Sequence, residues 1–119
     1  MDTVKLFEAE WNLMEILWET GPINSTKLVK VAGEALGWKK STTYTVVRKL
    51  GEKGALKNEG AVVMALLSKE DVLYQESSDF VSRYFENSLP SFVAAFTKKK
   101  KLTREEAEEL KKMIEEASS

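Results

Sequence analysis

The first third of the chain alternates apolar and polar residues with a helical period. Over about 7–19, Phe7, Trp11, Met14 and Trp18 recur every three or four residues, which predicts an amphipathic helix facing a core. A Gly-Pro pair then ends the helix. A second helix begins at Asn24 or Ser25, since either residue can cap it, and a glycine after residue 36 suits its C-terminal end.

The stretch KSTTYTVVRKLGEKG, which begins at residue 40, has conflicting signals. Its hydroxylated and β-branched residues favour a strand by intrinsic propensity. As a helix over about 41–53, however, it gathers Thr43, Val46, Val47 and Leu50 on one face, whereas a strand would mix apolar and polar residues on both faces. The periodicity therefore predicts a helix.

Two short strands are predicted next, at 55–58 and 62–66, with Glu59-Gly60 turning between them. Three helices followed by a hairpin form the order of a winged helix-turn-helix, in which the third helix occupies the recognition position. The predicted fold class is mainly α with a small β-hairpin. We predict that this domain covers residues 1–67.

Residues 68–119 have a different pattern of amphipathic helices. Ser68 with Asp71 and Thr103 with Glu106 fit capping boxes at two helix starts. Pro90 is expected to interrupt the first of these helices, and a short helix is expected at 91–98.

These C-terminal helices present apolar stripes without an obvious core of their own. We therefore predict that 68–119 is a helical region that forms a homodimer, and the alternative is that it folds back on the winged domain. The predicted dimerisation residues are Leu73, Phe80, Val81, Tyr84, Leu89, Phe92, Phe96, Leu110, Met113 and Ile114.

Composition narrows the class of protein further. The chain has 119 residues, no cysteine and no histidine, which excludes disulfides, thiol redox sensing and zinc sites built on those residues. The longest uncharged apolar run, at 61–67, is too short to span a membrane, and the N-terminus does not resemble a signal peptide. We expect a cytoplasmic protein with no membrane insertion and no cofactor or metal.

The charge distribution indicates a nucleic-acid contact. The net charge is −1, but residues 1–21 carry one lysine and five acids, whereas residues 22–57 carry eight Lys or Arg and two Glu. A basic block within an acidic chain is typical of a local nucleic-acid contact, although a solvated basic face is the alternative.

The exposed face of the third helix carries the candidate chemistry. Short hydroxyls let the helix backbone approach base edges, and Arg or Lys can reach guanine or phosphate. The predicted DNA-binding residues are Lys39, Lys40, Ser41, Thr42, Tyr44, Thr45, Arg48, Lys49 and Lys57. Phosphate-binding glycine loops and nucleophile motifs are absent from the sequence, so we do not predict an enzyme.

At this point the sequence resembles the penicillinase-repressor family (BlaI/MecI/CopY). The resemblance rests on EAEWNLMEILWETGPIN, on the pattern W-x3-T-x2-T-x4-L-x2-KG-x-L from Trp38 to Leu56, on FVSRYFENSLPSFVAAF and on LTREEAEELKKMIEE. It implies a dimeric repressor of a palindromic double-stranded DNA operator, with winged N-terminal domains on DNA and C-terminal helices in the dimer.

The resemblance also implies a route to induction. In antibiotic-responsive members a membrane-bound sensor peptidase triggers cleavage between an Asn and a Phe in the dimerisation region. Here the corresponding pair is Ala95–Phe96, so Ala stands where the family has Asn. The cysteine pattern of copper-responsive members is absent, and the hairpin carries an acidic Glu59 where family wings are usually basic.

Two other functions fit parts of the pattern. One is a winged protein-interaction module with weak or lost DNA binding, which the acidic wing allows. The other is a winged regulator of the multiple-antibiotic-resistance class, which senses a small ligand in a dimer-interface pocket.

Overall fold

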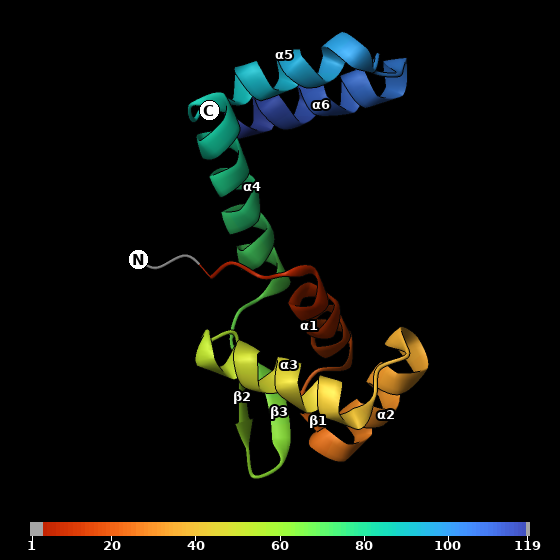
Figure 1. The fold of residues 1–119 in the computed structure, drawn as a ribbon. Helices are drawn as coiled ribbons and strands as arrows, with labels where there is room; N and C mark the ends of the chain where they lie inside the picture. The colour runs from red at the N-terminus through yellow and green to blue at the C-terminus, as the bar shows by residue number, and fades with distance from the viewer. Residues whose placement is uncertain (1–3, 119) are drawn as a thin grey trace. The chain divides into compact units, whose positions relative to one another are not determined.

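The structure is a computed structural model that describes residues 4–118. Within this range the chain forms six helices and one three-stranded sheet (Figure 1). The helices are α1 (Glu8–Thr20), α2 (Ser25–Leu36), α3 (Lys40–Glu52), α4 (Lys69–Phe85), α5 (Leu89–Lys99) and α6 (Arg104–Ala117), and the strands are β1 (Ile23–Asn24), β2 (Leu56–Glu59) and β3 (Val62–Ala65). The predicted class, mainly helical with a small hairpin, is confirmed.

The chain divides into two compact units, and the division falls between Ser77 and Ser78, inside α4. The N-terminal unit thus contains α1 to α3, the sheet and the first turns of α4. The predicted boundary between residues 67 and 68 lies at the start of α4. It stays a prediction.

The core of the N-terminal unit is supplied by one face of each helix and by the sheet. On α1 the fully buried residues are Leu13, Met14 and Leu17. Phe7, which the sequence placed on the buried stripe, precedes the helix and is 65% exposed. The helical period was right, but the stripe begins one turn later than predicted.

Local signals fix the bounds of α2. The Asn24 side chain caps the helix by accepting a hydrogen bond from the Thr26 N–H at 2.9 Å. At the other end Gly37 adopts a left-handed conformation with φ of 70°, which glycine reaches without the steric cost of a side chain. Both ends lie where the sequence predicted them.

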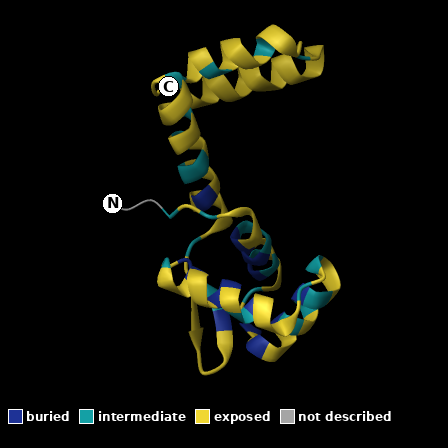
Figure 2. Cartoon of the chain, in the orientation of Figure 1, coloured by how far each residue is buried: buried dark blue, intermediate teal, exposed yellow. Residues whose placement is uncertain are grey.

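The ambiguous stretch forms α3, which confirms the prediction of a helix over a strand. Thr43, Val46, Val47 and Leu50 are all buried, and the opposite face is exposed (Figure 2). The Thr43 hydroxyl donates to the Lys39 carbonyl at 3.2 Å, so a polar side chain in the core is satisfied within the helix. Burial of this apolar face therefore outweighs the poor helix propensity of the residues.

The sheet has the strand order β1-β3-β2 and is antiparallel throughout. In the hairpin, Lys57 pairs with Met64 and Glu59 with Val62. The turn lies at Gly60 and Ala61, both with positive φ, one residue later than predicted. Figure 1 shows the hairpin beside α3, as expected for a wing next to a recognition helix.

The junction between α4 and α5 corrects the sequence prediction. Helix α4 ends at Phe85, and the break lies at Glu86 and Asn87, which have positive φ. Pro90 does not interrupt a helix, because it occupies the first turn of α5, where a missing N–H leaves no bond unmade. Leu89 therefore belongs to α5 and does not continue the stripe of α4.

The C-terminal unit has almost no interior of its own. From Ser78 to Ser118 no described residue is buried, and every residue of α6 is exposed (Figure 2). Thr103 caps α6, accepting the Glu106 N–H at 3.0 Å while the Glu106 carboxylate accepts the Thr103 N–H, as the predicted capping box requires. No helix formed by the described residues has the length and apolarity needed to cross a bilayer.

Candidate nucleic-acid interface

One surface of α3 combines hydroxyls with positive charge. Ser41, Thr42, Thr45, Arg48 and Lys49 are all exposed, on the side of the helix opposite its buried residues. The Thr45 hydroxyl donates its hydrogen to the Ser41 carbonyl at 2.9 Å, so toward a ligand its oxygen can act only as an acceptor. The sequence thus identified the exposed face correctly, and its role in binding DNA stays a prediction.

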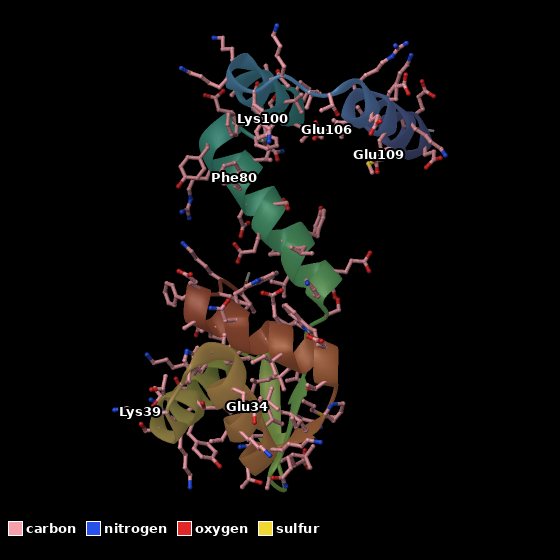
Figure 3. The ribbon with its side chains drawn as sticks, turned by 90° about the vertical axis from the view of Figure 1, so that its right-hand side faces the viewer. Glu34, Lys39, Phe80, Lys100, Glu106 and Glu109 are labelled. Carbon is pink, nitrogen blue, oxygen red and sulfur yellow. The ribbon has the colours of Figure 1, made fainter. Side chains whose placement is uncertain are left out.

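The N-terminal end of α3 gathers further positive charge. Lys39 precedes the helix and caps it without a side-chain hydrogen bond, and Figure 3 shows it at the outer end of α3. The Lys40 ammonium lies 6.0 Å from the centre of the half-buried Tyr44 ring, at the limit of a cation–π contact. Because the backbone N–H groups of a helix start favour anions, these lysines add to a site suited to phosphate.

Two of the predicted DNA-contact cations are paired with carboxylates. Arg48 Nη1 lies 2.9 Å from Glu52 Oε1, one turn along α3. Lys57 Nζ lies 3.3 Å from Glu59 Oε2, two residues along β2. The acidic residue of the wing is evident in the sequence, but neither pair was predicted, although the i,i+4 spacing of Arg48 and Glu52 is a recognisable signal.

A partly buried ion pair that was not predicted from the sequence fixes the C-terminal end of α3. Lys53, the residue after α3, pairs with Glu10 of α1, whose side chain is only 4% exposed. The same ammonium donates to the Lys5 carbonyl at 2.8 Å and lies 4.3 Å from the centre of the Phe7 ring. Lys53 was part of the KG motif that carried the family resemblance, and its structural role is to join α3 to α1 and the preceding segment.

The predicted dimerisation residues lie largely in solvent in the single chain. Leu73, in the N-terminal unit, is exposed, as are Phe80, Tyr84, Leu89, Phe96, Leu110, Met113 and Ile114, whereas Val81 and Phe92 are half-buried. Phe80, Phe85 and Phe92 contact one another, with ring centres 5.4 to 5.9 Å apart, and they join α4 to α5. The structure thus provides an aromatic cluster open to solvent.

The predicted cleavage pair lies inside a helix. Ala95 and Phe96 are both exposed residues of α5, which continues to Lys99. Within the described residues there is no group of three or more His, Cys, Asp or Glu arranged to hold a metal ion.

These elements define the class of protein. Three helices around a core, a hairpin against the third helix and a polar, cationic exposed face on that helix constitute a winged helix-turn-helix protein. The sequence profile of the penicillinase repressor family matches residues 6–116. The chain therefore belongs to the penicillinase repressor family, which confirms the BlaI/MecI resemblance.

Curated relatives cover nearly the whole chain. The penicillinase repressor of Bacillus licheniformis is 28% identical over 116 residues, covering 94% of this chain and 91% of that protein. The methicillin resistance regulatory protein MecI of Staphylococcus aureus strain N315 is 24% identical, covering 94% of each chain.

A solved structure resembles part of the chain. The monomeric form of Bacillus licheniformis BlaI in complex with the blaP half-operator matches with a TM-score of 0.51 and 26% identity. The match covers 59% of this chain and 90% of that one.

Proposed function

We propose that the protein is a DNA-binding transcriptional repressor that acts as a homodimer on a palindromic operator. The observation that carries the proposal is the exposed face of α3, where hydroxyls and cations stand together on a winged helix-turn-helix. Membership of the penicillinase repressor family and the likeness to a BlaI domain described with its half-operator support the same function.

Each part of the α3 surface has a distinct role in the proposal. Ser41, Thr42 and Thr45 are short enough to bring the helix backbone close to base edges in the major groove. Arg48 and Lys49, one to two turns further on, reach guanine or phosphate. Lys39, Lys40 and Lys57 contact phosphates and set the position of α3 on the duplex, with Tyr44 beside Lys40.

The dimer follows from the poor burial of the C-terminal unit. Helices α5 and α6 contain no buried residue, although Leu110, Met113 and Ile114 form an apolar stripe on α6. Such a stripe is stable in water when a second surface covers it, and a second copy supplies a matching surface by two-fold symmetry. Two winged units would then contact two symmetric half-sites.

We propose that repression is relieved by proteolysis in the C-terminal unit. A cut between Ala95 and Phe96 would separate α6 and the end of α5 from the rest of the chain. Because a peptidase binds an extended substrate, α5 would first have to unfold locally. We propose a membrane-bound sensor peptidase as the trigger, as the family resemblance implies.

The test is fluorescence anisotropy on the DNA upstream of the protein's own gene, with an unrelated duplex as competitor. If each protomer neutralises about four phosphates, log K should fall with log salt at a slope near −7 for a dimer. Replacing Arg48 and Lys49 by Ala should weaken binding without unfolding the protein. The matched control is Lys98→Ala with Lys99→Ala in the last turn of α5, which removes two exposed charges outside the winged unit.

The same material tests the dimer by sedimentation. We expect two protomers per site, and Met113→Asp with Ile114→Asp should produce monomers that keep the circular dichroism of a folded winged unit. A slope near zero and equal weak binding to both duplexes would refute DNA recognition and favour the protein-interaction module. A small molecule that lowers DNA affinity without cleavage would instead favour a ligand-sensing regulator.

A further inference from the structure

The two paired cations of the interface face the same hollow of the N-terminal unit. An open groove of about 680 Å³ lies between α3 and β2, with Arg48 and Glu52 on its helical side and Lys57 on its strand side. Any polyanion that followed α3 toward the wing would meet both cations there. Whether these two cations are paired with carboxylates or free therefore affects the electrostatics of DNA binding.

Each carboxylate contacts a cation that a DNA phosphate would also contact, so it would compete with the phosphate for that cation. Glu52 follows Arg48 by one helical turn, and the Arg48 and Glu52 side chains are 62% and 64% exposed. Glu59 shares a face of the hairpin with Lys57 because alternate residues of a strand point the same way, and these side chains are 78% and 46% exposed. A phosphate must displace each carboxylate or share its cation with it.

These pairs have little value for folding. An exposed ion pair contributes little to folding stability, since water screens the charges. Of the predicted DNA-contact cations, Lys39, Lys40 and Lys49 form no ion pair within the described residues, whereas Arg48 and Lys57, which line the α3–wing groove, do. The pairs thus act mainly on whatever approaches that groove.

We propose that Glu52 and Glu59 are intramolecular competitors that hold Arg48 and Lys57 and thereby lower the affinity of each winged unit for DNA. This inference rests on the proposed DNA-binding function. It gives the acidic residue of the wing a role, which is to weaken the contact of the wing with phosphate. A half-site alone is then bound weakly.

The experiment measures DNA affinity for Glu52→Gln, Glu59→Gln and the double variant over a range of salt concentrations. Glutamine keeps the size of each side chain and removes its charge. We expect each variant to bind about threefold more tightly and the double variant about tenfold, as the size of an exposed ion pair allows. The salt slope should steepen by up to about 0.9 for each cation released.

A charge-matched control separates local competition from a change in net charge. Glu19→Gln removes one negative charge from the end of α1, outside the groove, and should leave affinity unchanged. A second control combines Glu59→Gln with Lys57→Gln. If Glu59 acts by holding Lys57, its removal should have little effect once Lys57 is gone.

The outcomes distinguish the two proposals. If the wild type binds its DNA with a steep salt slope and both variants bind no better, the competition is refuted while the DNA-binding function stands. The competition is also refuted if Glu59→Gln is fully effective without Lys57, because direct repulsion would then explain it. If neither the wild type nor any variant binds DNA, both the function and the inference fail.

Discussion

The ion pair between Glu10 and Lys53 offers the sharpest test of how α3 is held in place. One oxygen of the Glu10 carboxylate accepts the Phe7 N–H at 2.8 Å and the Lys53 ammonium, and its other oxygen has no hydrogen-bond partner among residues 4–118. The Lys53 side chain is 28% exposed, so water reaches the ammonium far more readily than the carboxylate. The two partners should therefore respond differently to removal.

Lys53→Met keeps an unbranched stem beside Phe7 and removes the charge. A buried carboxylate without its cation costs about 3–5 kcal/mol, and the partial exposure of Lys53 places our expectation near 3 kcal/mol. For a domain of this size that corresponds to a fall in Tm of about 12–24 °C. Glu10→Gln should cost less, about 1.5 kcal/mol, because the released ammonium can return to water.

The assay is urea denaturation followed by tryptophan fluorescence. Trp11, Trp18 and Trp38 all lie in the N-terminal unit, so the signal reports on that unit alone. In a double-mutant cycle we expect a coupling energy of about 2 kcal/mol between Glu10→Gln and Lys53→Met. A matched control is Lys27→Met on α2, an exposed lysine, which should change stability by less than about 0.5 kcal/mol.

Purely additive single variants, with Lys53→Met costing under about 1 kcal/mol, would refute this reasoning. The pair would then behave as a solvated surface contact. The joining of α3 to α1 would have to come from apolar packing instead.

Three further expectations concern helix ends. Asn24→Ala should cost about 1 kcal/mol in urea denaturation, because the Thr26 N–H loses its cap, and an unchanged midpoint would contradict this. Gly37→Ala should cost about 1 kcal/mol in the same assay through backbone strain alone, since nothing lies within 4 Å of the added Cβ, and no loss would argue against the left-handed conformation. Hydrogen bonds from Thr103, first from its backbone N–H and second from its hydroxyl, lower the pKa of Glu106. The capping box therefore stabilises α6 at pH values above the ordinary carboxyl range. This stabilisation is lost as the pH falls through the lowered pKa. An NMR titration should find that pKa below the usual glutamate range, and Thr103→Ala should raise it part of the way back, whereas an unshifted pKa in the wild type would contradict the capping box.

The sequence predicted best where one periodic signal dominated. The fold class, the three helices of the winged unit and the buried face of α3 could be predicted because burial of an apolar stripe outweighs intrinsic propensity. Local chemistry narrowed the cap of α2 to Asn24 or Ser25 and predicted the ends at Gly37 and Thr103, because it requires no knowledge of distant residues.

Prediction failed where the partner of a residue was distant in the sequence, or where one local signal had two possible meanings. The Glu10–Lys53 pair joins residues 43 positions apart, and no periodicity connects them. Pro90 was predicted to interrupt a helix. A proline can either end one helix or begin the next, and the sequence does not distinguish these roles unless the actual break, at Glu86 and Asn87, is known. The α3 face was found because its signal is local. The i,i+4 spacing of Arg48 and Glu52 was equally local but was overlooked, whereas the Lys57–Glu59 pair follows from strand geometry and side-chain placement.

The proposed competition and the proposed dimer together explain where regulation would act. If Glu52 and Glu59 keep the affinity of each half-site low, tight binding depends on joining two winged units. Joining two sites raises apparent affinity by about 10²–10⁴ without any new contact, and that gain is lost when the link is cut. A cut between Ala95 and Phe96 would remove α6 from the dimer, leaving units that are folded but bind too weakly to stay on the operator. The double variant of Glu52 and Glu59 should accordingly repress more tightly and remain partly bound after such a cut, which anisotropy on cleaved protein would measure; equal release of wild type and variant would refute this link.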